Sequence, residues 1–415
     1  PMVNNLENFR TSVEHELSYL ALPGNAKPEQ ITTTWEAIAT NLQKHEQFGQ
    51  ELERKKYFEA EIDEVLTQSL DPVQRIYNIH HFVKNRMKWD GKYGILSSGN
   101  LKRNYENRIG SVADINLMLT AMLRYAGFYA NPVLVSTRSN GIPISVTTAG
   151  FNYVVCAVKH QEQFILLDAT SPHSLPDILP ERSLNWFGRM IDPNGFSEQI
   201  DFMPSTVSNQ RINLQYSIDE NGEVIGKYRC QYDNHLALEY RTRFSDTNKD
   251  SYVSFIENTY NSINISEYNE ENVNDLSRPV MESFSFSTSE AVDIVDDKLF
   301  LKPMLFLTLE ENPFKQDDRA FPIDFTYPVT SRYLVTINIP EGYTVDWMPE
   351  STTLALPNNA GSFKYMCQKS GNAIQLSITR SINSPVLPES YYAAVKELYN
   401  QVIEKETERI ILIKT

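Results

Sequence analysis

Cysteine is scarce in this sequence, and its scarcity excludes several kinds of small stabilised domain. The three cysteines, Cys156, Cys230 and Cys367, are far apart in the 415 residues. They are too few for a disulfide framework and do not show the CxxC spacing of a zinc site. The HExxH motif is missing too, and the adjacent His80 and His81 would point about 100° apart on a helix. We therefore expect no metal and no cofactor.

Positive charge and long apolar runs are also in short supply. Lys and Arg number 38 against 53 Asp and Glu, so the formal net charge is −15. A nucleic-acid backbone would be repelled, and we expect no nucleic-acid partner. No stretch reaches the ~20 apolar residues that span a bilayer, so no transmembrane segment is predicted. The opening PMVNNLENFR has no signal-peptide pattern, and we interpret the Pro-Met start as trimmed, which leaves room for an upstream signal.

The composition that remains is typical of a folded protein with more than one domain. Hydrophobic residues make up 41% and aromatic residues 11% of the chain, and single cores stop growing near ~250–300 residues. Residues 8–22 alternate like a strand with no obvious local partner, so we predict that 1–28 is the remnant of a preceding β-domain. We place the next two domains at 29–204 and 205–415.

The first of these two domains mixes helices with a short sheet. Helical periodicity covers 34–69, and Asp71-Pro72 predicts the start of another helix. A Gly-rich loop over 90–110 leads to a helix with apolar residues on nearly every face, which is expected at the centre of the domain and ends at Gly127. Two strands, 151–159 and 163–170, are predicted to form an antiparallel hairpin, and 172–200 is expected to be irregular.

The second domain is predicted to be mostly β. It opens with a strand, a DENG turn and a strand from 209 onward. The other expected elements are strands at 295–308, 322–339 and 374–381, helices at 249–262 and in LPESYYAAVKELYNQVIEKE, and the final strand RIILIK.

The start of the central helix is where chemistry is expected. Thiol enzymes place a cysteine in the first turn of a buried helix, where the helix dipole favours the thiolate. Here the helix start is Gly110-Ser111-Val112-Ala113-Asp114. Ser111 and Asp114 have the spacing of a capping box. We therefore interpret Ser111 as a helix cap rather than as a nucleophile.

The predicted hairpin adds a second part of the same site. A symmetric turn centred between His160 and Gln161 places Tyr153 opposite Asp168. Opposed side chains of an antiparallel pair lie ~4.5–5.5 Å apart at Cβ, so one can orient the other. A base held by an Asp in this way belongs to nucleophile–His–Asp sites, although Asp168 could equally be a turn-former before Pro172.

These segments together carry a family resemblance. GSVADINLMLTAMLRYAGFYANPVLVSTR, FNYVVCAV and FILLDAT resemble the core of bacterial transglutaminase-like proteins, over roughly 30–200. The resemblance implies an α+β, papain-type core, with a central buried helix packed on an antiparallel sheet and a β-sandwich-like domain after it. In that family the helix start carries Cys, one strand His and the next strand Asp. By position these fall on Val112, Tyr153 and Asp168.

The rest of the chain resembles the β-rich domain that follows such cores in Bacteroidetes proteins of unknown function. The resemblance lies in RAFPIDFTYP, VTINIPEGYTVDWMPES and the closing YYAAVKELYNQVIEKETERIILIK. Such proteins usually carry an export signal and another β-domain in front. The resemblance therefore implies a periplasmic or cell-surface location and agrees with a missing domain before the strand expected at 8–22.

The replaced residues lead to the functional expectation. Val has no lone pair for attack, and a phenol with a pKa near ~10 is a poor base at pH 7. We expect an inactive envelope protein that binds a peptide or protein ligand or acts as a scaffold, with Trp89, Ser111 and Asn152 as candidate cleft residues. The alternatives are an amide hydrolase or acyltransferase that uses Ser111, and a purely structural protein with a filled cleft. Cys156 is expected to be a buried structural residue.

Overall fold

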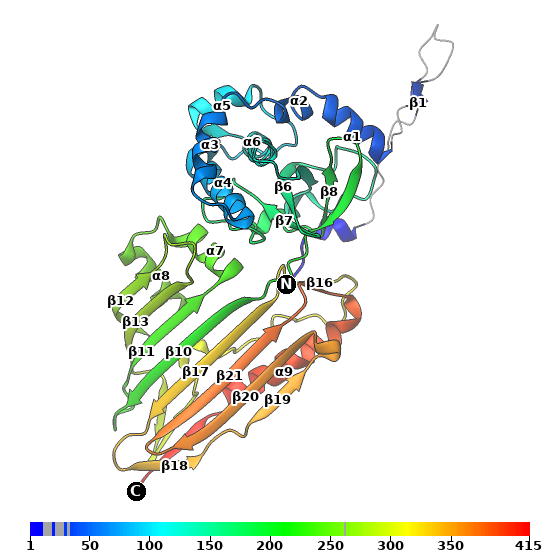
Figure 1. Ribbon diagram of the computed structural model, residues 1–415. Coiled ribbons are helices and arrows are strands. Elements are labelled where there is room, and N and C mark those ends of the chain that lie inside the picture. The colour runs from blue at the N-terminus through cyan, green and yellow to red at the C-terminus, as the bar shows by residue number, and fades with distance from the viewer. Residues whose placement is uncertain (11–18, 21–28, 31–33, 261–262) are drawn as a thin grey trace. The chain divides into compact units, whose positions relative to one another are not determined.

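The computed structural model describes residues 1–10, 19–20, 29–30, 34–260 and 263–415. The chain forms two compact units, Asn4–Met203 and Pro204–Thr415, with Pro1–Val3 belonging to the second (Figure 1). Most of the strand expected at 8–22 lies outside the described residues. Its first residues belong to a 3₁₀ turn, Leu6–Phe9, and its end, β1 (Tyr19–Leu20), pairs locally with β2 (Glu29–Gln30). The preceding β-domain stays a prediction.

The helices of the first unit begin where the sequence carries start signals. Asp71 accepts a hydrogen bond from the Gln74 amide (2.7 Å) and Pro72 occupies the first turn, which needs no amide donor. The expected loop at 90–110 contains a short helix, capped by the Asn100 side chain, which accepts from two backbone amides. The helices are α1 (Trp35–Lys44), α2 (Gly49–Leu52), α3 (Glu59–Thr67), α4 (Pro72–Arg86) and α5 (Leu101–Asn107).

Helix α6 (Val112–Tyr125) is the centre of this unit. Every residue from Val112 to Leu123 is buried, as expected for a helix that is apolar on nearly every face. The chain leaves it through Gly127, whose φ of +87° suits glycine. α6 packs on β5 and β6 of an antiparallel sheet. The sheet order is β7 (Gln163–Leu167), β6 (Tyr153–His160), β5 (Ala130–Val135), β8 (Phe187–Ile191), β9 (Ser197–Asp201).

Two expectations for this sheet were wrong. Strand β8 and most of β9 lie in the stretch 172–200 expected to be irregular, and β8 pairs with the distant β5 as well as with β9. The hairpin turn lies between Gln161 and Glu162, one residue later than expected, and His160 pairs with Gln163. Gln161 takes a φ of +53°, which a sequence argument does not assign to glutamine. Tyr153 therefore has no partner on β7.

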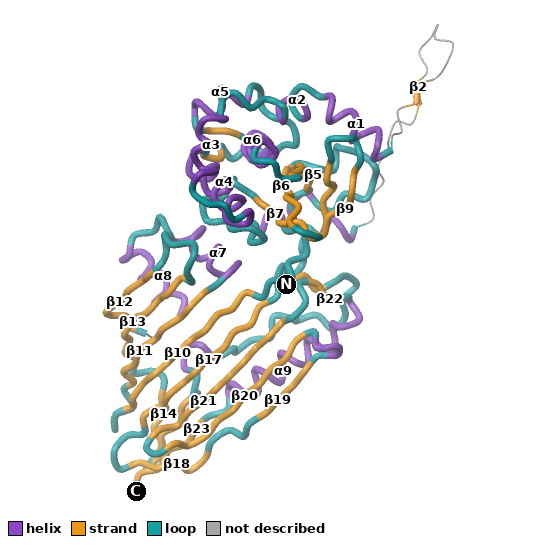
Figure 2. The backbone as a smooth tube through the Cα atoms, in the orientation of Figure 1, coloured by secondary structure: helices purple, strands orange, loops and turns teal. Residues whose placement is uncertain are grey.

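The second unit is built on a large sheet (Figure 2). Buried and exposed residues alternate along β10, with Ile212, Leu214, Tyr216 and Ile218 on the buried face. Neighbouring strands are antiparallel except for the parallel pair β10 and β17. The sheet order is β12 (Asn264–Glu271), β13 (Val280–Thr288), β11 (Val224–Tyr232), β10 (Ser208–Ile218), β17 (Val329–Asn338), β21 (Ala373–Ile382), β20 (Gly361–Ser370), β19 (Thr352–Ala355).

A second, smaller sheet and three helices complete this unit. One apolar core contains Leu376 of the large sheet, Leu412 of the small sheet and Val395 of α9, so both sheets and this helix share it. Helix α7, with its buried Ala237, Leu238 and Tyr240, was not expected from the sequence. The elements are β14 (Val292–Val295), β15 (Lys298–Leu301), β23 (Ile410–Lys414), β18 (Tyr343–Trp347), the pair β16 (Ile323–Asp324) and β22 (Val386–Leu387), α7 (Asn234–Phe244), α8 (Lys249–Tyr260) and α9 (Tyr392–Thr407).

The fold is thus a mixture of helices and largely antiparallel sheets, as expected. Within the described ranges, no helix combines the length and the apolar character needed to cross a membrane.

Candidate functional site

The first turn of α6 is fixed by a capping box, as the sequence predicts. The Asp114 amide donates to Ser111 Oγ (3.2 Å), and Asp114 Oδ2 accepts from both the Ser111 amide and its hydroxyl (2.8 Å each). A Cβ at Gly110 would lie 2.8 Å from the Asp114 Cβ, so this close approach requires glycine. Ser111 acts as a cap, and Val112 is the first helical residue, with a fully buried side chain.

Residues 89–98, which we call the strap, cross the start of α6. Strand β3 (Lys88–Trp89) pairs in parallel with β4 (Ile109–Gly110). The Lys92 carbonyl accepts from the Val112 amide (3.2 Å) and from Trp89 Nε1 (3.1 Å). At the far end of the strap, the Ser98 amide and hydroxyl donate to Asp114 (2.8 and 2.7 Å). The free amide that an oxyanion would need at position 112 is therefore already occupied.

The strap also reaches strand β6. The Gly94 amide donates to the Asn152 carbonyl (2.7 Å). The ring of Tyr93 lies against that of Tyr153, with centroids 5.9 Å apart, and also against Trp89 at 5.5 Å. Trp89 is thus part of the cover over the site. The strap thus contacts both Val112 and Tyr153, the positions predicted from the sequence for a nucleophile and a base.

Tyr153 and Asp168 meet despite the shifted hairpin. The Tyr153 hydroxyl donates to Asp168 Oδ2 (2.7 Å) and contacts Thr170 Oγ1 (2.8 Å). Asp168 follows the last residue of β7, and the length of the phenol side chain bridges the gap. Both side chains are fully buried. Burial and the nearby Asp168 carboxylate raise the pKa of Tyr153 well above its usual value, so the phenol stays protonated and cannot act as a base.

Arg182 supplies the positive charge of the site, and sequence reasoning missed it. Its Nε donates to the Tyr153 hydroxyl (3.0 Å) and its Nη2 to Thr170 Oγ1 (2.7 Å). Its guanidinium also lies 4.4 Å from the centroid of the Trp89 ring. Although burial opposes the charge, Tyr153 and Asp168 outweigh it and raise the pKa of Arg182. Arg182 comes from the short turn Glu181–Ser183, and no sequence signal points to it.

Asn116 was also missed, although the sequence offers a signal for it. Its Nδ2 donates to Asp168 Oδ1 (3.1 Å) and to the Val154 carbonyl (2.7 Å), and its Oδ1 accepts from the Ala169 amide (2.9 Å). It lies four residues after Val112 on α6, a spacing that puts both on one face of the helix. Asn116 therefore ties α6 to both strands of the site.

His80 of α4 contacts the backbone of the site at Asp168. Its Nε2 is 3.1 Å from the Asp168 carbonyl, and burial lowers its pKa to about 3. The ring is therefore neutral and donates its single N–H to that carbonyl. His81 instead bonds Asn85 at the surface (2.8 Å). Within the part of the chain that the structure describes, no group of three or more His, Cys, Asp or Glu residues is arranged to hold a metal ion.

Two further sequence candidates have structural contacts. Asn152 uses both ends of its amide on Thr137, accepting from the amide (2.8 Å) and donating to the hydroxyl (3.0 Å), and therefore braces the entry to β6. Cys156 is fully buried, and burial raises the pKa of its thiol to about 12, so it is no thiolate at neutral pH. The Ser111 hydroxyl donates to Asp114 Oδ2 and accepts from the Asp114 amide, and the Ser111 carbonyl accepts from the Ile115 amide.

Comparisons with known proteins describe the fold and leave the activity open. A family described as a domain of unknown function with a solved structure (DUF3858) matches residues 297–412. A crystal structure described as a "putative protease" from Parabacteroides distasonis superposes with a TM-score of 0.53 at 11% sequence identity. The match covers 97% of this chain and 63% of that one. The two proteins therefore share a fold, and this chain spans only part of the length of that neighbour. No curated protein matches.

Proposed function

We propose that residues 29–204 form a transglutaminase-like, papain-type core that has lost catalysis, and that the protein acts as a scaffold or ligand-binding protein of the bacterial envelope. The observation that supports this most is the pair Val112 and Tyr153. The first stands at the start of a buried helix without a nucleophilic atom, and the second is a protonated phenol held against Asp168. Covalent catalysis lacks both its nucleophile and its base.

The strap favours the scaffold over a peptide groove at this position. The Val112 and Tyr153 side chains are both inaccessible, and the amide at position 112 is bonded within the protein. A substrate carbonyl would have to displace the Lys92 carbonyl before it met a donor. Polar groups that once served catalysis are instead fully used to join α6, β6 and the strap, which is how a buried network specifies one structure.

The comparisons support the fold part of this proposal. A neighbour described as a protease agrees with a papain-type core, although at 11% identity it says nothing about activity here. The periplasmic or cell-surface location follows only from the resemblance of the sequence. Fractionation of the native host with antibodies against this chain would test it, and a cytosolic pool would contradict it.

The catalytic part is tested with the wild-type protein, Val112→Ala and Ser111→Ala. We expect no amide hydrolysis and no amine incorporation by the wild-type protein above buffer, since no group is available to form an acyl-enzyme. Host phenotypes, where deletion of the protein has one, should survive Val112→Ala. Turnover by the wild-type protein that is lost in Ser111→Ala would contradict the proposal and establish Ser111 as a nucleophile.

A further inference from the structure

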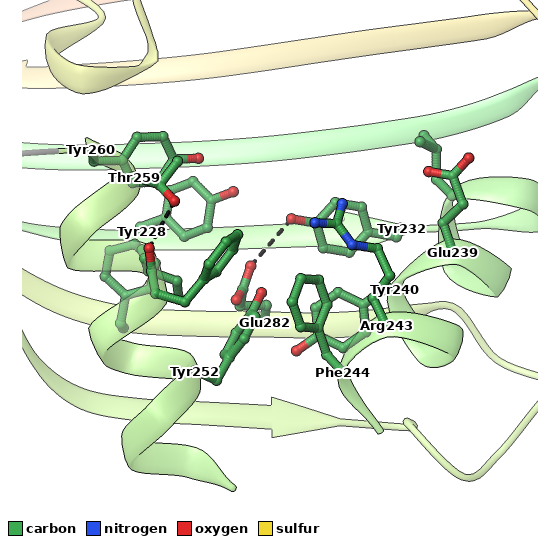
Figure 3. Close-up of a pocket in the computed structure, with 14 residues that line it drawn as sticks. Tyr228, Tyr232, Glu239, Tyr240, Arg243, Phe244, Tyr252, Thr259, Tyr260 and Glu282 are labelled. Atoms are coloured by element: carbon green, nitrogen blue, oxygen red, sulfur yellow. Dashed lines mark hydrogen bonds between the residues drawn. The ribbon is translucent and has the colours of Figure 1, made fainter. Parts of the chain in front are cut away.

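A pocket in the second unit is lined mostly by aromatic residues (Figure 3). It lies among α7, α8, β11 and β13 and has a volume of about 210 Å³. That size suits a small headgroup or the end of one side chain better than a folded segment. All of its lining residues belong to the second unit.

The rings form the walls of a cage. Tyr228 stacks on Phe284 with centroids 4.6 Å apart, and Tyr232 stacks on Tyr240 at 5.5 Å. Phe244 packs against Tyr252 at 4.6 Å. Aromatic rings carry negative potential on their faces, and a small pocket lined by many such rings suits a cation.

One acidic side chain lies in the wall of this cage. Glu282 of β13 is 4% exposed, and its Oε2 accepts from the Tyr232 hydroxyl (3.2 Å). Its Oε1 is buried without a hydrogen bond of normal geometry from any residue in the described ranges, and the hydroxyls of Tyr252 and Tyr268 lie close to the carboxyl group. A buried carboxylate oxygen without a partner is costly, and such atoms are rare in folded proteins.

The charges around the pocket favour a positive ligand. Glu239 and Glu282 line it together with one cation, Arg243, so the lining is net negative. The Arg243 guanidinium lies 5.1 Å from the Phe244 centroid, and among the described residues no ion pair involves Glu282. Burial raises the pKa of the Glu282 carboxyl, and a cation bound beside it would favour the ionised form.

From this geometry we infer that the pocket binds an organic ammonium group, with the aromatic rings around its alkyl substituents and the Glu282 carboxyl in the wall beside its charge. The same chemistry occurs in a free quaternary amine and in the side chain of a peptide lysine. This site is separate from the silent core, so its failure would leave the proposed function untouched.

Calorimetric titration of the full chain tests the inference with three probes. The probes are choline, 3,3-dimethylbutanol as its neutral isostere, and Nα-acetyl-lysine methylamide. We expect an ammonium probe to bind at least about tenfold more tightly than the neutral isostere. Tighter choline binding would indicate a free amine as ligand, and tighter binding of the lysine derivative would indicate a peptide. No heat from either ammonium probe up to about 10 mM, or equal binding of choline and its isostere, would overturn the inference.

Variants of opposite expected effect separate binding from structure. Glu282→Gln keeps the shape and the bond to Tyr232 and should weaken ammonium binding about tenfold or more. Arg243→Gln removes a repelling charge from the lining and should tighten it several-fold. Phe255→Leu, at a half-exposed ring of the lining, should weaken binding and serves as the test if Glu282→Gln fails to fold. Glu311→Gln, at an exposed carboxylate paired with Lys315, is the matched control and should change nothing. Equal affinity of the wild-type protein and Glu282→Gln would refute the role of Glu282.

Discussion

The hydroxyl of Tyr153 donates its proton to Asp168 Oδ2 over 2.7 Å, with both side chains fully buried. The partner of Asp168 on β6 is thus a phenol that donates a hydrogen bond. Unlike a histidine, it has no ring nitrogen that could accept a proton. The carboxylate accepts three more bonds, from Asn116 Nδ2 and from the amide and hydroxyl of Thr170. These bonds join β6, α6 and the end of β7, and their contributions to stability can be measured.

Tyr153→Phe should destabilise the first unit by roughly 1–3 kcal/mol, because it leaves Asp168 and Arg182 each short of one buried partner. Urea unfolding followed by tryptophan fluorescence measures this in a Trp347→Phe background, because Trp35, Trp89 and Trp186 then report only on the first unit. Tyr93→Phe, at a half-exposed ring, is the control. Equal midpoints for the two variants would show that the network does not stabilise the fold.

Acid should weaken the first unit through His80. Its pKa falls from 6.5 in the unfolded chain to about 3 in the folded one. Between these values the unfolded chain binds one more proton, so the contribution is complete above 6.5 and is lost as the pH falls toward 3. The expected slope is about 1.4 kcal/mol per pH unit.

His80→Gln isolates this effect. The glutamine amide can still donate to the Asp168 carbonyl but does not titrate. We expect the difference in free energy of unfolding between the wild-type protein and His80→Gln to shrink between pH 7 and pH 5. His235, whose pKa burial lowers to about 4, lies in the other unit and is unchanged in both proteins. A difference that is constant with pH would show that His80 is not buried and neutral.

A thiol placed at position 112 reports whether the strap keeps the site closed. The native thiols should react slowly, because burial raises the pKa of Cys156 and Cys230 to about 12 and of Cys367 to about 11. Val112→Cys should add a thiol labelled at least about tenfold more slowly in the folded protein than in urea, even though a helix start favours the thiolate.

Loosening the strap should reverse that protection. Trp89→Ala removes the hydrogen bond from the indole N–H to the Lys92 carbonyl, and it removes the ring that packs against Tyr93. Labelling of the Val112→Cys thiol should therefore become several-fold faster. The native cysteines in the same protein serve as internal controls. Rapid labelling without Trp89→Ala would mean that the cleft is open, and would favour the ligand-binding form of the proposal over the scaffold.

The features that were predicted best are those that depend only on residues close together in the chain. The cap at Asp71 and the Ser111–Asp114 box follow from side chains that bond their own backbone. The partners of β8 and the position of Arg182 depend on residues far along the chain, and no local pattern encodes them. Asn116 is an intermediate case. Its helical spacing from Val112 could have placed both residues on the same face of the helix.

The hairpin shows how a correct contact can follow from a wrong register. The sequence placed Tyr153 directly opposite Asp168, whereas β7 ends at Leu167 and pairs it with Cys156. The positive φ of Gln161 moves the turn, and turn chemistry assigns that conformation to Gly or Asn. The contact survives because a tyrosine hydroxyl lies far enough from its backbone to reach past the strand end.

The largest single loss of stability is expected in the second unit, at Arg380 and Glu406. Glu406 of α9 is fully buried and accepts from Arg380 Nε (2.7 Å), from Arg380 Nη2 and from the Leu309 amide (3.1 Å). Burial raises the pKa of Glu406 even with the arginine present. Arg380→Met should therefore cost about 3–5 kcal/mol, because it leaves a carboxyl in the core without its cation.

The double variant Arg380→Met/Glu406→Leu separates the worth of the pair from the cost of breaking it. Two apolar side chains of similar volume need no partners, so we expect the double variant to recover most of the loss in urea unfolding followed by circular dichroism. Lys315→Met, which breaks an exposed pair with Glu311, is the matched control and should leave the midpoint unchanged. A double variant as unstable as Arg380→Met would mean that the ion pair itself stabilises the sandwich, beyond satisfying its own buried charges.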